Sequence, residues 1–147
     1  MSHYSDKHYI QSKDYDKFYY DILFRKGDKI LDIGCSTGNF NAQDPKNILG
    51  IDIGADAIKI AKKRGFNAFV CDVTKRLPFK ENWIENVHCR HVLEHLNEPL
   101  PFMVEIFRIL KKKGRLVLLT DKMNSHFWDD YTHQKPFTNI SLEQLAY

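Results

Sequence analysis

Residues 30–38 read Ile-Leu-Asp-Ile-Gly-Cys-Ser-Thr-Gly, and this stretch decides the fold class of the chain. Its apolar start suits a short buried strand, and the glycines suit a turn that brings the backbone close to a ligand. In α/β sheets, ligands bind at the carboxyl ends of the strands, beside the first strand. The stretch therefore predicts the first strand of an α/β domain and the beginning of a ligand site.

Strands and helices alternate along the rest of the chain. Short runs of β-branched and aliphatic residues predict strands over 29–33, 48–52, 68–71, 86–90 and 115–120. Apolar residues at helical spacing predict helices over 15–24, 56–64 and 101–110. This alternation predicts an α/β fold with a doubly wound, mostly parallel sheet and flanking helices.

Three of the apolar runs follow a basic cluster and a glycine, within residues 23–34, 61–72 and 110–121. Lys and Arg in a last helical turn face the negative end of the helix dipole, and glycine closes the turn. We therefore interpret Lys62–Arg64 and Lys111–Lys113 as helix ends rather than as a surface for nucleic acid or a membrane.

The composition is that of an ordinary globular domain, with 147 residues, 43% of them hydrophobic and 28% charged. This length suits a single domain over 1–147, and the composition excludes a disordered chain. A net charge of +3 is too small to indicate a nucleic-acid partner. No apolar run is long enough to span a membrane, and the first residues lack an apolar signal core, so we expect a cytoplasmic protein. Cys35, Cys71 and Cys89 suit reduced thiols there.

Two further predicted strands end in an acid. Asp52 follows Asp32 by 20 residues, and Asp72 follows after another 20. An acid at this spacing can accept the ribose hydroxyls of an adenosine ligand. Gly34 and Gly38 do not form the Gly-x-Gly-x-x-Gly pattern of dinucleotide sites, and the carboxylate of Asp32 would repel pyrophosphate but attract a cation. The charges therefore favour S-adenosylmethionine (SAM), although acids that only cap turns remain an alternative.

Taken in order, these segments resemble the motifs of class I SAM-dependent methyltransferases. LDIGCSTG resembles the first motif, GIDI the second, CDVTKRLPF the third, VHCRHVLEHL the fourth and ILKKKGRLVLLT the fifth-strand segment. The resemblance covers about residues 20–121. It implies a sheet of strand order 3-2-1-4-5, normally extended by a 6–7 hairpin, and transfer of the methyl group of SAM.

The resemblance also assigns residues to the cofactor. The implied SAM-binding residues are Asp32, Gly34, Cys35, Ser36, Gly38, Asp52, Ile53, Asp72, Val73, Arg90 and His91. Within this set, Asp32 would lie at the methionine part of SAM, Asp52 on the ribose and Asp72 at the adenine amino group. Arg90 and His91 would line the methionine and the sulfonium.

The sequence departs from the family pattern in two places. Ser36 stands where the family often has a glycine, and only residues 39–44 precede Pro45, so we expect a loop or a single turn after the first strand. The family's sixth and seventh strands have no counterpart after residue 121. We therefore expect a domain shortened at its carboxyl end, with Ser141 capping a short last helix. A partner, a second copy or the last segment would cover the apolar edge of the fifth strand.

His95 and His133 are the candidate catalytic residues. His95 belongs to the fourth motif, and His133 lies in the polar, aromatic segment 128–138, which resembles a segment of methyltransferases found beside sugar-polymer synthesis functions. Either imidazole could act as a general base for a hydroxyl acceptor, although positioning alone also supports methyl transfer. Ordinary surface-loop roles are the alternative. Residues 91–95 also match the zinc pattern His-x-x-Glu-His, but His91 ends a strand, so we expect no metal.

Aromatic residues crowd the amino-terminal segment, where they would form either a lid over SAM or ordinary packing. They are Tyr4, Tyr9, Tyr15, Phe18, Tyr19 and Tyr20.

The sequence thus predicts a methyltransferase that modifies an oxygen or nitrogen of a small-molecule, glycan or lipid acceptor. The chain has no Asn/Asp-Pro-Pro-Tyr motif and no Pro-Cys pair, which disfavours methylation of nucleic-acid bases. A non-catalytic SAM- or nucleotide-binding subunit and an NAD-dependent oxidoreductase remain as alternatives.

Overall fold

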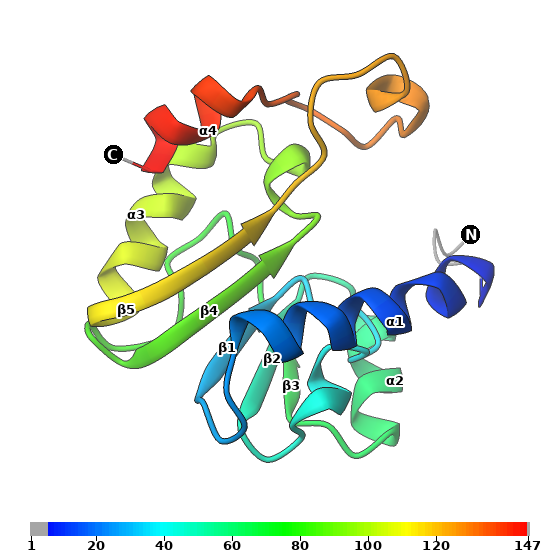
Figure 1. Ribbon diagram of the computed structural model, residues 1–147, viewed down its shortest axis with the longest axis vertical. Coiled ribbons are helices and arrows are strands. Elements are labelled where there is room, and N and C mark those ends of the chain that lie inside the picture. The colour runs from blue at the N-terminus through cyan, green and yellow to red at the C-terminus, as the bar shows by residue number, and fades with distance from the viewer. Residues whose placement is uncertain (1–5, 147) are drawn as a thin grey trace. The chain divides into compact units, whose positions relative to one another are not determined.

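The sheet of this protein has five parallel strands in the order β3-β2-β1-β4-β5, as the sequence predicts (Figure 1). The computed structural model describes residues 6–146, and the side chains of residues 15–146. The chain divides into two compact units, Met1–Cys71 and Asp72–Tyr147. The expectation of a single domain stays a prediction.

The first unit is a three-stranded parallel sheet with its helices. Its elements are α1 (Asp6–Leu23), β1 (Ile30–Ile33), the short 3-10 helix η1 (Asn41–Gln43), β2 (Ile48–Asp52), α2 (Ala55–Lys63) and β3 (Ala68–Val70). All four residues of β1 are buried, which is typical of a parallel strand that is covered on both faces. The single turn of η1 confirms the expected short connection after the first strand.

The end of α2 confirms one predicted helix end. Lys62 and Lys63 lie in its last turn, and Gly65 follows with a φ of +86°. Glycine adopts this left-handed conformation without steric cost. The basic residues therefore stabilise a helix terminus at this point.

The aromatic residues of α1 divide into a buried and an exposed set. Tyr20 packs against Phe24 and Phe40, and its hydroxyl donates to Asp44 Oδ2 at 3.2 Å. Tyr15 and Phe18 are exposed, so they do not pack into the core, but the Phe18 ring lies edge-on to that of the half-buried Tyr19 with centroids 5.7 Å apart. The lid interpretation stays a prediction, and it extends to Tyr4 and the side chain of Tyr9, which lie outside the described residues.

The second unit pairs two strands and carries the carboxyl-terminal elements. Its elements are β4 (Ile84–Arg90), the 3-10 helix η2 (Leu93–His95), α3 (Pro99–Ile109), β5 (Leu110–Leu119), the 3-10 helix η3 (Phe127–Asp129) and α4 (Asn139–Ala146). The segment after β5 folds back on itself, because Lys122 and Phe137 form an isolated parallel bridge. None of the described helices has the length and apolar character that crossing a membrane requires.

The interpretation of Lys111–Lys113 as a helix end is wrong. These residues belong to β5, which begins directly after α3. Ile84 of β4 pairs with Leu110 and Asn86 pairs with Arg115, so the intervening lysines form a bulge in β5. Lys113 has a φ of +67° within this bulge. A Cβ on Gly114 would lie 2.7 Å from the carbonyl oxygen of Lys111, so this glycine permits close backbone approach instead of closing a helix.

The predicted cap of the last helix is also wrong, by three residues. Helix α4 begins at Asn139, so Thr138 is the cap and Ser141 is the third helical residue. Ser141 N donates to Thr138 Oγ1 at 3.1 Å, and Thr138 N donates to Ser141 Oγ at 2.8 Å. This reciprocal pair satisfies two amide groups at once, which is why the helix begins earlier than predicted.

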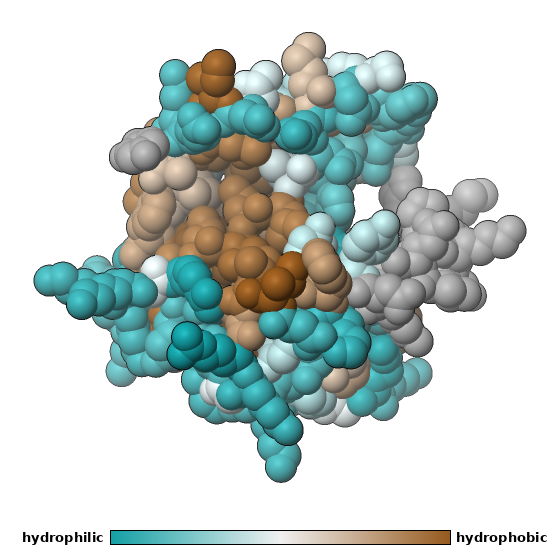
Figure 2. All heavy atoms as spheres, in the orientation of Figure 1, coloured by the Kyte–Doolittle hydropathy of each residue, from teal (hydrophilic) through white to brown (hydrophobic). Residues whose placement is uncertain are grey.

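The strand order leaves β5 at an edge of the sheet, as expected from the sequence. Residues 116–119 of this strand are only half-buried. Figure 2 shows apolar residues gathered over β4 and β5 on the visible face. The segment after β5 forms the bridge between Lys122 and Phe137, and its helix α4 contacts α3. Among residues 6–146, the sheet contains no strand on the outer side of β5.

Candidate functional site

The turn after β1 has three residues with positive φ. Gly34 has a φ of +78°, Ser36 of +49° and Gly38 of +84°. The amides of Gly34 and Cys35 both donate to the carbonyl of Ile51, at 2.8 and 3.1 Å. The turn is therefore anchored to the end of β2, and Ser36 adopts a conformation that favours glycine.

Asp52 is held in place by this turn. The carboxylate accepts from Ser36 N at 2.9 Å through Oδ2 and from Gly54 N at 2.7 Å through Oδ1. The residue is only 7% exposed. Each oxygen has a second lone pair, so the carboxylate is oriented and can still accept from a ligand.

Asp32 lies inside β1 and is only 2% exposed. The amide of Asn41 connects it to the next strand. In the amide orientation that satisfies both side-chain atoms of Asn41, the oxygen accepts from Gly50 N at 3.2 Å and the nitrogen donates to Asp32 Oδ2 at 3.3 Å. The position of this buried carboxylate is therefore fixed by the 3-10 helix η1.

Cys35 is buried, and its backbone groups are engaged within the turn: its amide donates to Ile51 O at 3.1 Å and its carbonyl accepts from Gly38 N at 2.9 Å, so its role toward SAM stays a prediction. The side chain packs in a cluster with Ile58, Ala61 and Ala68. A Cβ on Gly50 would lie 2.6 Å from Cys35 Sγ, so no side chain fits there. Burial, together with the charges of the two nearby aspartates, raises the pKa of the thiol, which excludes a thiolate nucleophile.

Ile53 and Asp72, which the resemblance to the family places at the adenine, have contrasting surroundings. Ile53 follows β2 and is 69% exposed, as a side chain that packs against a ligand would be in the free protein. In the second unit, Asp72 Oδ1 accepts from Thr74 N at 3.0 Å and from Thr74 Oγ1 at 2.6 Å. These bonds and Lys75 lower the pKa of Asp72. Asp72 thus caps its own turn, and its role toward adenine stays a prediction, as does that of the half-buried Val73.

Arg90 is the last residue of β4 in the second unit, and His91 follows it. His91 has a φ of +52°, and its amide donates to the carbonyl of Leu119 at 2.9 Å. This turn directs its ring toward Glu94, with Nδ1 lying 2.9 Å from Oε1. The assignment of Arg90 and His91 to SAM stays a prediction.

Glu94 is a fully buried acid that the sequence-based list of site residues missed. Thr120 Oγ1 donates to its Oε2 at 2.8 Å, and the amide of Asp121 approaches Oε1 at 3.4 Å. Burial raises the pKa of Glu94, but the hydrogen bonds from His91, the backbone and Thr120 outweigh it, so the pKa lies below its usual value. Glu94 therefore carries a negative charge inside the second unit.

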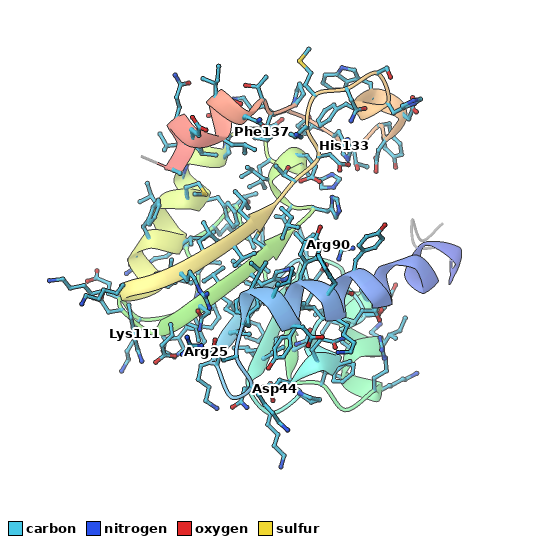
Figure 3. All side chains as sticks on the ribbon, viewed as in Figure 1. Arg25, Asp44, Arg90, Lys111, His133 and Phe137 are labelled. Atoms are coloured by element: carbon cyan, nitrogen blue, oxygen red, sulfur yellow. The ribbon has the colours of Figure 1, made fainter. Side chains whose placement is uncertain are left out.

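His95 and His133 lie together although 38 positions separate them, with ring centroids 4.9 Å apart. Figure 3 shows His133 on the segment that links β5 to α4. His133 Nε2 lies 3.9 Å from a carboxylate oxygen of Asp121 and 3.9 Å from one of Asp130. The structure thus brings the two predicted catalytic residues into one cluster. A catalytic role for either stays a prediction.

The sequence contains a partial signal for the missed acids. Asp121 directly follows the predicted fifth strand 115–120, as Asp72 follows the third and Asp52 ends the second, so the rule of acids at strand ends would have found it. Glu94 stands inside the His-x-x-Glu-His match. Asp130 has no such signal, because it comes near the histidines only through the fold of the 120–138 segment.

A family model described as a methyltransferase domain matches residues 31–118. An uncharacterized protein of Methanocaldococcus jannaschii is 37% identical over 97 residues, which are 65% of this chain and 42% of that protein. A ubiquinone/menaquinone biosynthesis C-methyltransferase of Desulfotalea psychrophila is 31% identical over 111 residues, which are 67% of this chain and 45% of that enzyme. The chain thus spans less than half the length of these curated relatives.

A solved structure shows the same fold. The SAM-dependent methyltransferase of Archaeoglobus fulgidus matches with a TM-score of 0.78 at 23% identity, over 95% of this chain and 72% of that chain. The match of the family model covers more than half of the chain and runs from the first strand into the fifth. The chain therefore belongs to the methyltransferase domain family and has the class I Rossmann-like fold of SAM-dependent methyltransferases.

Proposed function

We propose that this chain binds SAM and transfers its methyl group to an oxygen or nitrogen of a small-molecule, glycan or lipid acceptor. The observation that carries the proposal is the carboxylate of Asp52, which two backbone amides orient at the end of β2. Its remaining lone pairs suit the two ribose hydroxyls of an adenosine. Nearby, the buried carboxylate of Asp32 suits a cationic ligand better than a pyrophosphate.

Methyl transfer requires little from the protein beyond the positioning of SAM and the acceptor. The acceptor atom forms a bond to the methyl carbon while the carbon–sulfur bond breaks, and the electron pair of that bond stays on sulfur. The products are the methylated acceptor, S-adenosylhomocysteine and a proton. Positioning the two reactants in line supplies much of the rate. His95 and His133 are the candidates to take or direct the acceptor's proton.

The partner of the edge strand belongs to the same proposal. The half-buried apolar residues 116–119 of β5 suit pairing with another polypeptide, either a second copy or a different protein. Analytical ultracentrifugation over a range of chain concentrations tests for the second copy. A chain that stays monomeric at all concentrations would contradict pairing of β5 with a second copy.

The activity is tested with methyl-labelled SAM. We expect label to move to at least one acceptor in a panel of hydroxylated sugars, lipids and amines, and S-adenosylhomocysteine to form in equal amount. Binding of S-adenosylhomocysteine without transfer to any acceptor would instead support the non-catalytic binding subunit. Binding of NAD in place of S-adenosylhomocysteine would contradict the proposal and support the oxidoreductase.

A further inference from the structure

A group of histidines and carboxylates gathers around Glu94 in the second unit. We call it the histidine–carboxylate cluster, and it consists of His91, Glu94, His95, Asp121 and His133. The potential ligand atoms of Glu94, His95 and His133 all lie within 4.8 Å of one another, and the same holds for those of His91, Glu94 and Asp121. Glu94 belongs to both triplets, so the cluster has a single centre.

Backbone carbonyls fix the orientation of two of the imidazoles. His133 Nδ1 lies 2.7 Å from the carbonyl oxygen of Phe127, and His95 Nδ1 lies 3.2 Å from that of Thr132. A carbonyl oxygen only accepts, so Nδ1 carries the proton in both rings. In the neutral ring each Nε2 then keeps a lone pair for a metal ion, the arrangement in which metal-binding histidines are commonly oriented by a hydrogen bond from the other ring nitrogen.

The negative carboxylates around the His133 ring favour a bound cation. His133 Nε2 lies 3.9 Å from Oδ2 of both Asp121 and Asp130, and the His133 side chain is only 8% exposed. In the neutral form of the ring, the Nε2 lone pair faces two carboxylates whose side chains are 46% and 50% exposed, so water screens their repulsion only in part. A bound cation relieves this repulsion, and so does a proton on Nε2, which is the alternative that the experiment has to separate.

We propose that Glu94, His95 and His133 bind one divalent transition-metal ion of the zinc type, through a carboxylate oxygen and the two Nε2 atoms. Two imidazoles and one carboxylate form the ligand set of open zinc sites, in which the remaining position takes water or substrate. Asp121, whose Oδ2 lies 3.9 Å from His133 Nε2, would either ligate the ion or orient what binds there. The zinc pattern in residues 91–95 thus contributes Glu94 and His95, while the second imidazole comes from His133 and not from His91.

The role of this ion rests on the proposed function. An acceptor hydroxyl at the open position would lose its proton to solvent water, because the ion lowers the pKa of an oxygen bound to it. The ion would thus supply a more nucleophilic acceptor oxygen for the methyl transfer described above, in which the carbon–sulfur bond breaks and its electron pair stays on sulfur. In this arrangement His95 and His133 hold the ion and leave the acceptor's proton to water. An oxygen acceptor is therefore favoured over a nitrogen acceptor.

Metal binding is tested on the full chain after removal of metals by a chelator. We expect calorimetric titration with Zn²⁺ to show one ion per chain, and Mg²⁺ not to compete at equal concentration, because the site contains two imidazoles. Co²⁺ should give visible absorption bands without a thiolate charge-transfer band, which excludes cysteine ligands. His95→Ala and His133→Ala should each weaken Zn²⁺ binding at least about 100-fold.

His126→Ala is the matched control. His126 belongs to the same unit, its side chain is 83% exposed, and it pairs only with Asp129 within the described contacts. We expect this variant to bind Zn²⁺ like the unchanged chain. His95→Ala decides the question if His133→Ala does not fold, because His95 lies at the surface and tolerates truncation more easily.

Two results would overturn the metal site: no Zn²⁺ binding to the folded chain, or binding that neither His95→Ala nor His133→Ala weakens. Either result leaves the cluster as a hydrogen-bonded network that holds no metal ion. Titration with S-adenosylhomocysteine in the presence of chelator tests the proposed function separately. Loss of one kind of binding with the other intact therefore identifies which proposal has failed.

Discussion

At the residue scale, left-handed backbone conformations decide which side chains the turns accept. Gly38 and Gly65 have nearly the same φ, +84° and +86°. They differ in their surroundings, because a Cβ on Gly38 would lie 2.5 Å from Cδ2 of Phe66, whereas a Cβ on Gly65 meets nothing within 4 Å. The two positions therefore separate backbone strain from a steric clash.

We expect Gly38→Ala to lower the free energy of unfolding by about 2–3 kcal/mol, the sum of the strained φ and the displaced Phe66 ring. Gly65→Ala, the control, should lower it by only about 1 kcal/mol. Urea denaturation of both variants measures the difference. Equal losses would mean that the ring of Phe66 moves aside without cost.

A second prediction at the residue scale concerns pH. Glu105 accepts from Leu77 N at 2.8 Å and pairs with Arg108 at 2.7 Å, and Arg108 also donates to the carbonyl of Phe79 at 2.8 Å. The hydrogen bond from Arg108 holds the pKa of Glu105 at about 2, below its usual value of 4.5. Because the pKa is lower in the folded state, this contribution to stability is complete above about pH 4.5 and is lost as the pH falls toward 2.

We expect Glu105→Gln to lower the free energy of unfolding by about 2 kcal/mol at pH 7 and by less below pH 4.5. Denaturation at several pH values measures both effects. The control is Glu85→Gln, which breaks a half-exposed ion pair with Lys111 and should cost less than about 1 kcal/mol. A loss for Glu105→Gln that does not change with pH would contradict the ionic explanation.

At the scale of elements, the reciprocal cap of α4 shows what local sequence could and could not predict. A helix near the carboxyl end follows from the pattern of residues 141–144. Its first residue does not, because Thr138 and Ser141 are both good caps, and only the bond pattern decides between them. The bulge in β5 is a similar case. A basic cluster before a glycine fits both a helix end and a strand distortion, and pairing with β4 decides.

We expect Thr138→Ala to weaken α4 by about 1 kcal/mol, because it removes the oxygen that accepts from Ser141 N. Amide hydrogen exchange in residues 141–146 measures this change directly and should become several-fold faster. Asn139→Ala is the control, since Asn139 is an exposed first helical residue. Equal acceleration in both variants would show that the cap contributes nothing of its own.

At the scale of the whole molecule, the alternation of strands and helices predicts a parallel sheet, and the order of its strands could be predicted because the ordered motifs resemble those of class I SAM-dependent methyltransferases. Short apolar runs, glycines after the first run and acids at the run ends occur at regular spacing, and together they fit one family of folds. The cluster around Glu94 could not be predicted in the same way. His133 and Asp130 reach it through a 120–138 segment without periodicity, so no spacing rule connects them to residues 91–95.

The central claim is that Asp52 binds the ribose of SAM, and calorimetric titration of the full chain with S-adenosylhomocysteine tests it most directly. We expect one-to-one binding by the unchanged chain. Asp52→Asn should bind about 10- to 100-fold more weakly, a loss of about 1.4–2.7 kcal/mol, because the amide loses the charge that strengthens two hydrogen bonds.

The control in this titration is Asp56→Asn, which alters an exposed acid in the first turn of α2 and should bind like the unchanged chain. Equal affinities for the unchanged chain and Asp52→Asn, with both folded, would contradict the assignment of the ribose to Asp52. Absence of binding to the unchanged, folded chain would contradict the proposed function itself.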